Sequence, residues 1–188
     1  MMNYKKPPTI IKSGGELTRE ELETINLYRR SEFGAKEETR PESGNGDWRN
    51  KYFLIKDGQG GVLAFGVIRP AQIQFQQKIY SILEFVSLVS IKKGEGYGSS
   101  LMEQMKKYAE VEGKTLIGFC TSDMVPFYQK NGLETTMGLP DRFEFIKDEL
   151  SFPGETPGEA VYVGGEDKLI EELSKFPQET AYIYRHKS

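Results

Sequence analysis

The segment Lys92–Leu101 constrains this chain most, because three glycines at alternate positions directly follow a long apolar run. That run, residues 81–91, has the β-branched and aromatic content of a buried strand. Gly94, Gly96 and Gly98 can adopt positive φ, which permits a sharp turn and a close approach of backbone to ligand. We therefore predict a strand, a glycine-rich turn and a helix in succession.

Such a turn is typical of a phosphate-binding site. The first N–H groups of a helix lack intrahelical partners and lie at the positive end of its dipole, so they bind anions. Lys92 and Lys93 add positive charge there. A dinucleotide-binding motif requires glycine where this chain has Ser99 or Leu101, and the Walker motif is absent. Because neither nucleotide motif fits well, a nucleotide-binding protein ranks third, after the two hypotheses given below.

Two motifs together resemble a known superfamily. The turn Lys93-Gly94-Glu95-Gly96-Tyr97-Gly98 is similar to motif A of the GCN5-related N-acetyltransferase (GNAT) superfamily, which grips the pyrophosphate of coenzyme A. The later segment Val125–Leu133 resembles the family's Tyr-x-Lys-x-Gly-Phe helix, with Leu133 in place of Phe. Lys93 stands where Arg or Gln is usual. The two motifs occur in family order.

The resemblance implies both a fold and a reaction. The expected fold is α/β (α+β), with a mixed, mostly antiparallel, V-shaped sheet flanked by helices and an elaborated C-terminal region. The expected reaction is direct transfer of the acetyl group of acetyl-CoA to a primary amine, without a metal ion. With 188 residues, the chain is expected to form a single domain over residues 1–188.

The resemblance also implies which residues hold the coenzyme. Backbone contacts are expected from the residues of the turn and the helix start, which are Lys93, Gly94, Glu95, Gly96, Tyr97, Gly98 and Ser99. Leu88 and Val89 occupy the donor strand, and the Val89 N–H is the candidate oxyanion donor, worth on the order of 3 kcal/mol. Ser122, with Thr121, lies where the family often has an asparagine that contacts the pantetheine arm; helix capping is the equal alternative.

Two side chains are candidates for the chemistry. Tyr128 matches the family tyrosine that protonates or hydrogen-bonds the leaving thiolate, and the alternative is an aromatic packing residue. The base is harder to assign, since the single histidine is His186, near the C-terminus. Glu84 interrupts an apolar strand and is the candidate base, with water or another carboxylate as alternatives. A strand-end or ion-paired glutamate at the surface is the competing, structural interpretation.

The net charge of the chain limits the classes of molecule that it is expected to bind. A formal net charge of -3 and a pI near 5.4 argue against a nucleic-acid binder and mildly favour a cationic acceptor. No segment has the apolar length of a membrane span or a signal-peptide core, so we expect a cytoplasmic protein. The lone Cys120 is expected to fill core space at a strand end.

The acceptor is predicted only by class. In the polar segment 34–50, four acidic residues (Glu37, Glu38, Glu42 and Asp47) lie near Trp48 and form either an anionic mouth or a solvated loop. We expect a small amine, such as an aminoglycoside or a polyamine. The alternatives are a protein-lysine or N-terminal acetyltransferase and a non-catalytic acyl-CoA sensor. The region from Glu134 onward shapes the acceptor pocket or forms a homodimer face.

The periodicity of the sequence predicts the remaining elements. Thr18 and Glu21 form a capping box that begins a helix reaching about Ser31. A second helix is expected over Tyr97–Glu112, ended by Gly113. The other expected helices are Val125–Lys130 and Asp167–Leu173. The expected strands are Thr9–Lys12, Tyr52–Ile55, Val62–Ile68, Ile79–Ile91, Leu116–Cys120, Phe143–Ile146, Ala160–Val163 and Ala181–Tyr184, with an irregular excursion over Ser151–Gly158.

Overall fold

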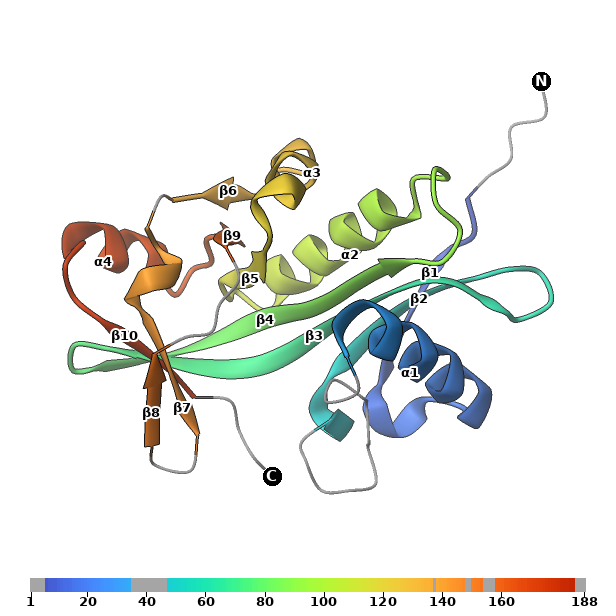
Figure 1. The fold of residues 1–188 in the computed structure, drawn as a ribbon, viewed down its shortest axis with the longest axis horizontal. Coiled ribbons are helices and arrows are strands. Elements are labelled where there is room, and N and C mark those ends of the chain that lie inside the picture. Colours follow the sequence, from blue (N-terminus) through green and yellow to red (C-terminus); the bar gives the residue numbers. More distant parts are fainter. Residues whose placement is uncertain (1–5, 35–46, 137, 148–149, 154–157, 185–188) are drawn as a thin grey trace. The chain divides into compact units, whose positions relative to one another are not determined.

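The computed structural model describes residues 6–34, 47–136, 138–147, 150–153 and 158–184. These residues form four α-helices and ten strands of a mixed, mostly antiparallel sheet (Figure 1). The helices are α1 (Arg19–Phe33), α2 (Tyr97–Val111), α3 (Val125–Lys130) and α4 (Leu169–Lys175). The strands are β1 (Thr9–Ser13), β2 (Lys51–Lys56), β3 (Val62–Phe75), β4 (Lys78–Ser90), β5 (Leu116–Cys120), β6 (Glu134–Thr135), β7 (Phe143–Lys147), β8 (Leu150–Pro153), β9 (Glu159–Val163) and β10 (Ala181–Tyr184). The predicted fold class is confirmed.

The chain divides into two compact units. The first unit comprises Met1–Ile68 and Ser87–Met105, and the second comprises Arg69–Val86 and Lys106–Ser188. Strands β3 and β4 and helix α2 contribute residues to both. The single domain expected over residues 1–188 stays a prediction, and each unit is described by itself.

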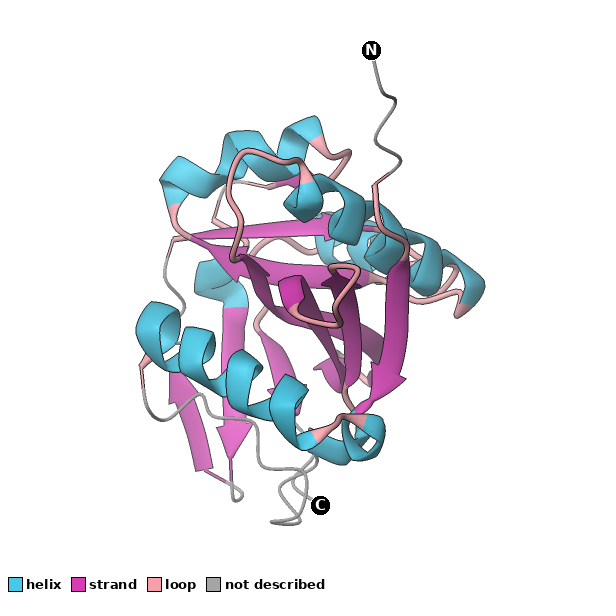
Figure 2. Ribbon diagram, turned by 90° about the vertical axis from the view of Figure 1, so that its right-hand side faces the viewer, coloured by secondary structure: helices cyan, strands magenta, loops and turns pink. Residues whose placement is uncertain are grey.

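In the first unit, helices lie on both faces of an antiparallel sheet (Figures 1 and 2). Strand register places Lys12 of β1 opposite Tyr52 of β2, and the Lys12 side chain reaches α1. The next residue, Phe53, points to the other face and is paired with Gly66 of β3. A Cβ at Gly66 would lie 2.7 Å from the sulfur of Met105 in α2. Gly66 therefore lets α2 pack closely on the sheet.

The capping box that begins α1 also joins the helix to the sheet. Thr18 and Glu21 cap each other's backbone N–H groups, as predicted. Glu21 is only 2 % exposed and accepts hydrogen bonds from Lys12 at 2.8 Å and Lys56 at 2.9 Å. Burial alone would raise the pKa of Glu21, but the hydrogen bonds from Lys12, the Thr18 backbone and Lys56 outweigh it and lower that pKa to about 2.

The second unit contains the strand order β6-β9-β5-β4-β3-β10-β7-β8. Its described ladders are antiparallel except for β4 with β5 and β7 with β10. Isoleucines of four neighbouring strands, together with leucines of α4, form one buried cluster: Ile73, Ile82, Ile117, Ile183, Leu169 and Leu173. Each such side chain contributes roughly 1.5–3 kcal/mol on burial. This cluster fixes α4 on the sheet.

Beyond shifts of one residue at strand ends, three strands differ from expectation, and the first is β6, which was not predicted. Strand β3 was expected to end at Ile68 but continues to Phe75. Pro70 lies between the end of the β2 pairing at Ile68 and the start of the β10 pairing at Gln72, so neither of these two ladders requires its missing N–H. The expected excursion from Ser151 was partly wrong, since β8 pairs with β7 as a hairpin. Ser151 and Pro153 are poor strand signals, and the pairing with β7 overrides them.

We expect Glu21→Gln to lower the free energy of unfolding by about 2 kcal/mol at pH 7, because two ammonium groups lose their carboxylate. The pKa of Glu21 in the folded state lies below the unfolded value near 4.3. Its stabilisation is therefore fully present above about pH 5 and is lost as the pH falls toward 2. Urea unfolding of both proteins across this range measures the difference.

The matched control is Glu23→Gln, since Glu23 pairs with Arg19 on the exposed side of α1. We expect it to change the unfolding free energy by less than about 0.5 kcal/mol. An equal effect of the two variants, or a Glu21 effect that does not depend on pH, would contradict the prediction.

Candidate active site

The glycine-rich turn has the conformation that phosphate binding requires. Gly94 and Gly96 adopt φ of 83° and 71°, and α2 begins immediately afterwards at Tyr97. Gly98 lies inside the helix and does not need positive φ. The Ser100 N–H donates to the Gly96 carbonyl at 3.2 Å, so the N–H groups of 97–99 precede the first intrahelical bond. These N–H groups are the donors that a pyrophosphate would use.

Hydrogen bonds hold the entrance to this turn. The N–H groups of Ile91 and Lys92 both donate to the Leu63 carbonyl of β3, at 3.0 and 3.2 Å. The Ser90 hydroxyl donates to the Lys92 carbonyl at 2.8 Å. Lys92 and Glu95 form an exposed ion pair of 3.5 Å across the turn. The turn is therefore organised by the protein itself, and its residues 92–96 are exposed.

The predicted residues divide between the two units. Leu88, Val89 and residues 93–99 belong to the first unit, whereas Glu84, Ser122 and Tyr128 belong to the second. Val89 is 6 % exposed and Leu88 is half-buried, with a terminal methyl carbon 3.5 Å from a Cβ placed on Gly66. The role of the Val89 N–H stays a prediction.

Tyr128 is buried in an aromatic cluster of the second unit. It lies on α3, is 6 % exposed, and its ring centroid lies 5.3 Å from that of Phe85 and 5.2 Å from that of Phe127. Gly118 of β5 makes this packing feasible, because a Cβ there would overlap the Phe85 ring. Burial, and to a smaller extent Cys120, raises the pKa of Tyr128 to about 12. The phenol therefore stays protonated throughout the physiological range.

Glu84 is buried and ion-paired. Its side chain is 3 % exposed, and Arg69 of β3 donates to one carboxylate oxygen from Nη2 at 2.7 Å and from Nε at 3.2 Å. Both residues belong to the second unit. This geometry supports the structural interpretation of Glu84, although the carboxylate is buried rather than on the surface. Its role as the base stays a prediction.

Many solved structures resemble this chain at low sequence identity, among them the following three. The GNAT family N-acetyltransferase YhbS from Escherichia coli, solved in complex with CoA, matches with a TM-score of 0.60, 14% identity, and coverage of 97% of this chain and 93% of that one. An acyl-CoA N-acyltransferase from Pseudomonas aeruginosa matches with a TM-score of 0.53 and 16% identity, over 82% of this chain and 97% of that one. ElaA from Escherichia coli matches with a TM-score of 0.54 and 14% identity, over 82% of this chain and 96% of that one. Neither a family model nor a curated protein matches the sequence.

The chain has the GNAT fold. In this fold, the turn before α2 occupies the place that the motif resemblance predicted, and α3 carries Tyr128 directly after β5. The predicted bounds of β5 and α3 are confirmed. Among the described residues, no group of three or more His, Cys, Asp or Glu could hold a metal ion. Within that same part of the chain, no helix has the length and apolar character to cross a membrane.

Between β5 and α3, the expected residues have different surroundings. Ser122 and Thr121 are exposed at a short 3₁₀ helix, and the Thr121 side chain makes no cap hydrogen bond. The coenzyme role of Ser122 stays a prediction. Cys120 ends β5 and is 8 % exposed, as expected of core filler. Burial raises the pKa of the Cys120 thiol to about 11, so this side chain stays protonated at neutral pH.

The acidic segment is only partly visible. Glu37, Glu38 and Glu42 lie outside the described residues, as does His186. Asp47 begins a 3₁₀ helix that continues into Trp48 and Arg49. Trp48 is 48% exposed, and the Arg49 guanidinium lies 4.8 Å from its ring centroid. A cation therefore already covers one face of this indole.

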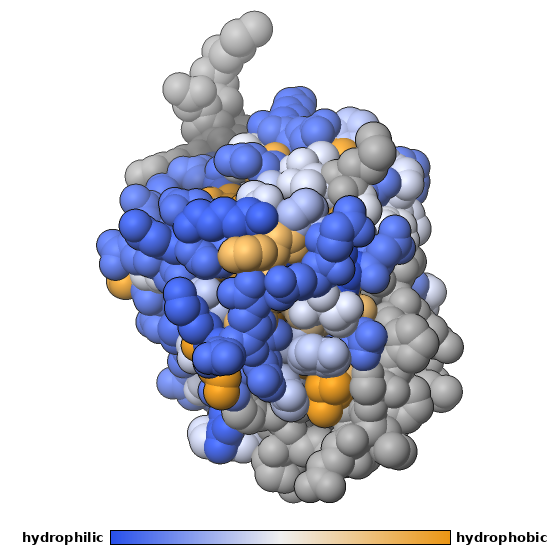
Figure 3. Space-filling view, turned by 90° about the vertical axis from the view of Figure 1, so that its left-hand side faces the viewer, coloured by the Kyte–Doolittle hydropathy of each residue, from blue (hydrophilic) through white to orange (hydrophobic). Residues whose placement is uncertain are grey.

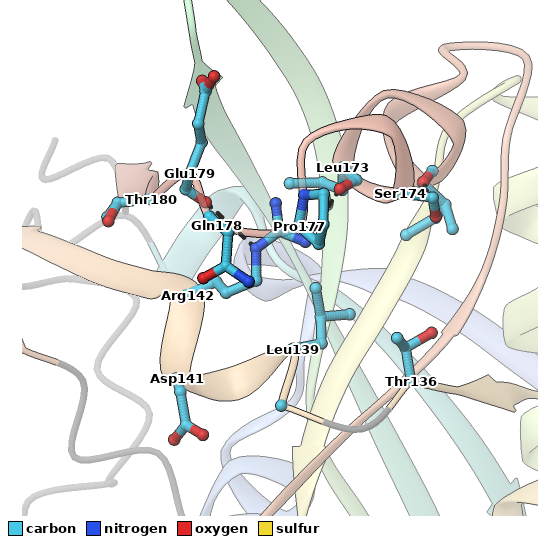
Figure 4. Close-up of a pocket in the computed structure, with 12 residues that line it drawn as sticks. Thr136, Leu139, Asp141, Arg142, Leu173, Ser174, Pro177, Gln178, Glu179 and Thr180 are labelled. Carbon is cyan, nitrogen blue, oxygen red and sulfur yellow. Dashed lines mark hydrogen bonds between the residues drawn. The ribbon is translucent and has the colours of Figure 1, made fainter.

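The GNAT fold of this chain also has a pocket that the sequence did not reveal. It has a volume of about 610 Å³, lies beside α4 in the second unit, and none of the predicted site residues lines it. Arg142 donates to the carbonyls of Glu179 at 3.1 Å and Leu173 at 3.0 Å (Figure 4). It also donates to the Phe176 carbonyl at 2.7 Å. Its guanidinium thus binds backbone carbonyls at and after the end of α4.

The surface around α4 is mainly hydrophilic. Figure 3 shows that apolar side chains on this face form small, separate patches among polar ones. A stable homodimer face is usually a broader apolar area. This face therefore lends no support to the homodimer considered for the C-terminal region.

If Glu84 is structural, Glu84→Gln should lower the free energy of unfolding by about 2 kcal/mol, because it leaves the Arg69 guanidinium without its carboxylate. Urea unfolding at neutral pH measures this loss. The double variant Arg69→Met/Glu84→Met should recover stability relative to Glu84→Gln, because no charge is then left unpaired. Unchanged stability in Glu84→Gln, together with lost turnover, would instead identify Glu84 as the base.

Proposed function

We propose that this chain is an N-acetyltransferase that transfers the acetyl group of acetyl-CoA to a primary amine. The observation that carries the proposal is the exposed turn at 92–96, with positive φ at Gly94 and Gly96, directly before α2 in a GNAT fold. Two of the similar solved structures are acyltransferases, and one of these contains CoA. The backbone N–H groups of 97–99 would hold the pyrophosphate.

The bound thioester supplies the acetyl group. The amine nitrogen forms a bond to the carbonyl carbon, the carbon–sulfur bond breaks, and the sulfur leaves as a thiolate. Tyr128 is proposed to donate a hydrogen bond to this thiolate. With a phenol pKa of about 12 against about 8.5 for a free thiol, complete proton transfer from the phenol is uphill. Hydrogen bonding to the anion is the role that these values favour.

The attacking amine must also lose a proton. Because Glu84 is engaged with Arg69, we propose that water removes this proton and that the amine reacts in its neutral form. The Val89 N–H is proposed to polarise the acetyl carbonyl, as the resemblance implies.

The proposed acceptor is a small cationic amine, such as an aminoglycoside or a polyamine. The support is the net charge of -3 and the acidic residues of segment 34–50. A protein lysine or N-terminus is the alternative acceptor, and a non-catalytic acyl-CoA sensor is the alternative function. No structural observation favours either alternative over the enzyme.

The first test is calorimetric titration with acetyl-CoA. Ser99 lies in the first turn of α2, where a glutamate is compatible with the helix and is often favourable. Ser99→Glu should weaken binding at least about tenfold, because its charge repels the pyrophosphate. Ser99→Gln has nearly the same size without the charge and should bind more tightly than Ser99→Glu. Substitution of Gly94 or Gly96 is less informative, since each has positive φ and would strain the turn.

Failure of the wild-type protein to bind acetyl-CoA would exclude the acetyltransferase. Displacement of acetyl-CoA by ATP or NAD at similar concentrations would favour the nucleotide-binding hypothesis. Equal affinities of Ser99→Glu and Ser99→Gln would move the phosphate site away from this turn.

The second test separates an enzyme from a sensor. Tyr128→Phe keeps the ring contacts with Phe85 and Phe127 but removes the hydroxyl. We expect kcat to fall by about 10- to 100-fold, while the affinity for acetyl-CoA stays within about twofold. Thiol release with a polyamine, an aminoglycoside and a lysine peptide measures the rate and the acceptor preference. Unchanged kcat in Tyr128→Phe would limit Tyr128 to packing, and absence of turnover with every amine would favour the sensor.

A further inference from the structure

The N-terminal segment brings a cation to the glycine-rich turn. Lys6 Nζ donates a hydrogen bond to the Gly96 carbonyl at 3.4 Å, although the two residues are 90 positions apart. A Cβ placed on Gly96 would lie 2.6 Å from this ammonium nitrogen. The missing side chain at Gly96 therefore permits both the positive φ of the turn and the approach of Lys6. Both residues belong to the first unit.

The hydrogen bond to Gly96 is a weak one for an ammonium group. At 3.4 Å it is long, and the same carbonyl accepts from the N–H and the hydroxyl of Ser100, each at 3.2 Å. An ammonium has three protons to donate, and within the described residues this is the hydrogen bond that the structure gives Lys6. A stronger, anionic acceptor at the start of α2 would compete well for it.

Lys92 is less suited to this role, because it already forms an ion pair with Glu95 of the same turn. Glu95 thus offsets one of the two turn lysines, Lys92 and Lys93, and a further cation would strengthen the attraction of the turn for a diphosphate. Lys6 provides this cation from outside the turn.

The connection to the sheet restricts where Lys6 can go. Pro7 and Pro8 follow it, and β1 then starts at Thr9, paired with Ile55 of β2. Each proline fixes its own φ, and the residue before a proline is also restricted. A stiff link lowers the entropy lost when the ammonium is held at the turn.

We propose that Lys6 is a phosphate-binding residue of this protein and contacts the pyrophosphate of coenzyme A at the start of α2. The proposal rests on the proposed function. It gives the N-terminal segment a role in holding the coenzyme, although Lys6 lies outside both sequence motifs. Lys6 acts on binding and not on the transfer step.

The test is calorimetric titration with CoA at about 20 and about 300 mM salt, since the Debye length shortens between these conditions. Lys6→Gln should weaken binding about tenfold at low salt, which corresponds to about 1.4 kcal/mol. The loss should shrink at high salt. Lys6→Arg should retain most of the affinity, and the control Lys5→Gln, which removes the same charge one residue earlier, should stay within about twofold of wild type.

A second measurement excludes a purely structural effect. Acetyl-pantetheine carries the thioester without the phosphates, so its KM should be equal in wild type and Lys6→Gln. The melting temperature should also be unchanged. A loss that extends to acetyl-pantetheine, or that Lys5→Gln reproduces, would overturn the role of Lys6.

The failures of the two proposals differ. If wild type binds CoA and Lys6→Gln binds it equally well, the role of Lys6 is excluded while the acetyltransferase stands. If wild type does not bind CoA, the proposed function fails and the role of Lys6 fails with it.

Discussion

The passage from β4 into α2 is the constraint on which the candidate site depends. The Leu63 carbonyl holds the end of β4 through two N–H groups, and positive φ at Gly94 and Gly96 then directs the chain into the helix. In the same unit, Met105 of α2 packs against Gly66 of the sheet. The helix must therefore start at Tyr97, with its first N–H groups at the exposed turn. The candidate anion site therefore depends on backbone geometry more than on a particular side chain.

Burial gives the two chemical candidates opposite characters. Tyr128 is enclosed by aromatic rings, so its phenol stays protonated and can donate a hydrogen bond. Glu84 is equally buried, but Arg69 compensates its charge at 2.7 Å. Burial of a carboxylate requires a partner such as this guanidinium, whereas burial of a phenol keeps its proton in place. The proposed roles of both residues start from these different states.

Local sequence signals predicted the helices and strands whose ends are marked by capping residues or glycines. The capping box at Thr18 and Glu21 and the glycine at 113 mark helix ends by local chemistry, and β5, α3 and β10 were predicted with the bounds observed. Prediction was wrong where pairing overrides local preference. Strand β3 continues past Pro70 because its partners change there, and β8 forms against β7 despite Ser151 and Pro153. Helix α4 was expected over Asp167–Leu173 but runs over Leu169–Lys175. Asp167 instead lies before the helix and accepts a hydrogen bond from the Leu169 N–H at 3.0 Å.

By itself, the sequence determined the glycine-rich turn, the helix that follows it and the aromatic segment carrying Tyr128, because each depends on neighbours within one or two turns of chain. Only the tertiary structure decided which charged side chains contact distant parts of the chain. Lys6 reaches Gly96 over 90 residues, Lys56 reaches Glu21 over 35, and Arg69 reaches Glu84 over 15. The physical reason is that these contacts depend on strand register and helix packing, which no local pattern in the chain encodes.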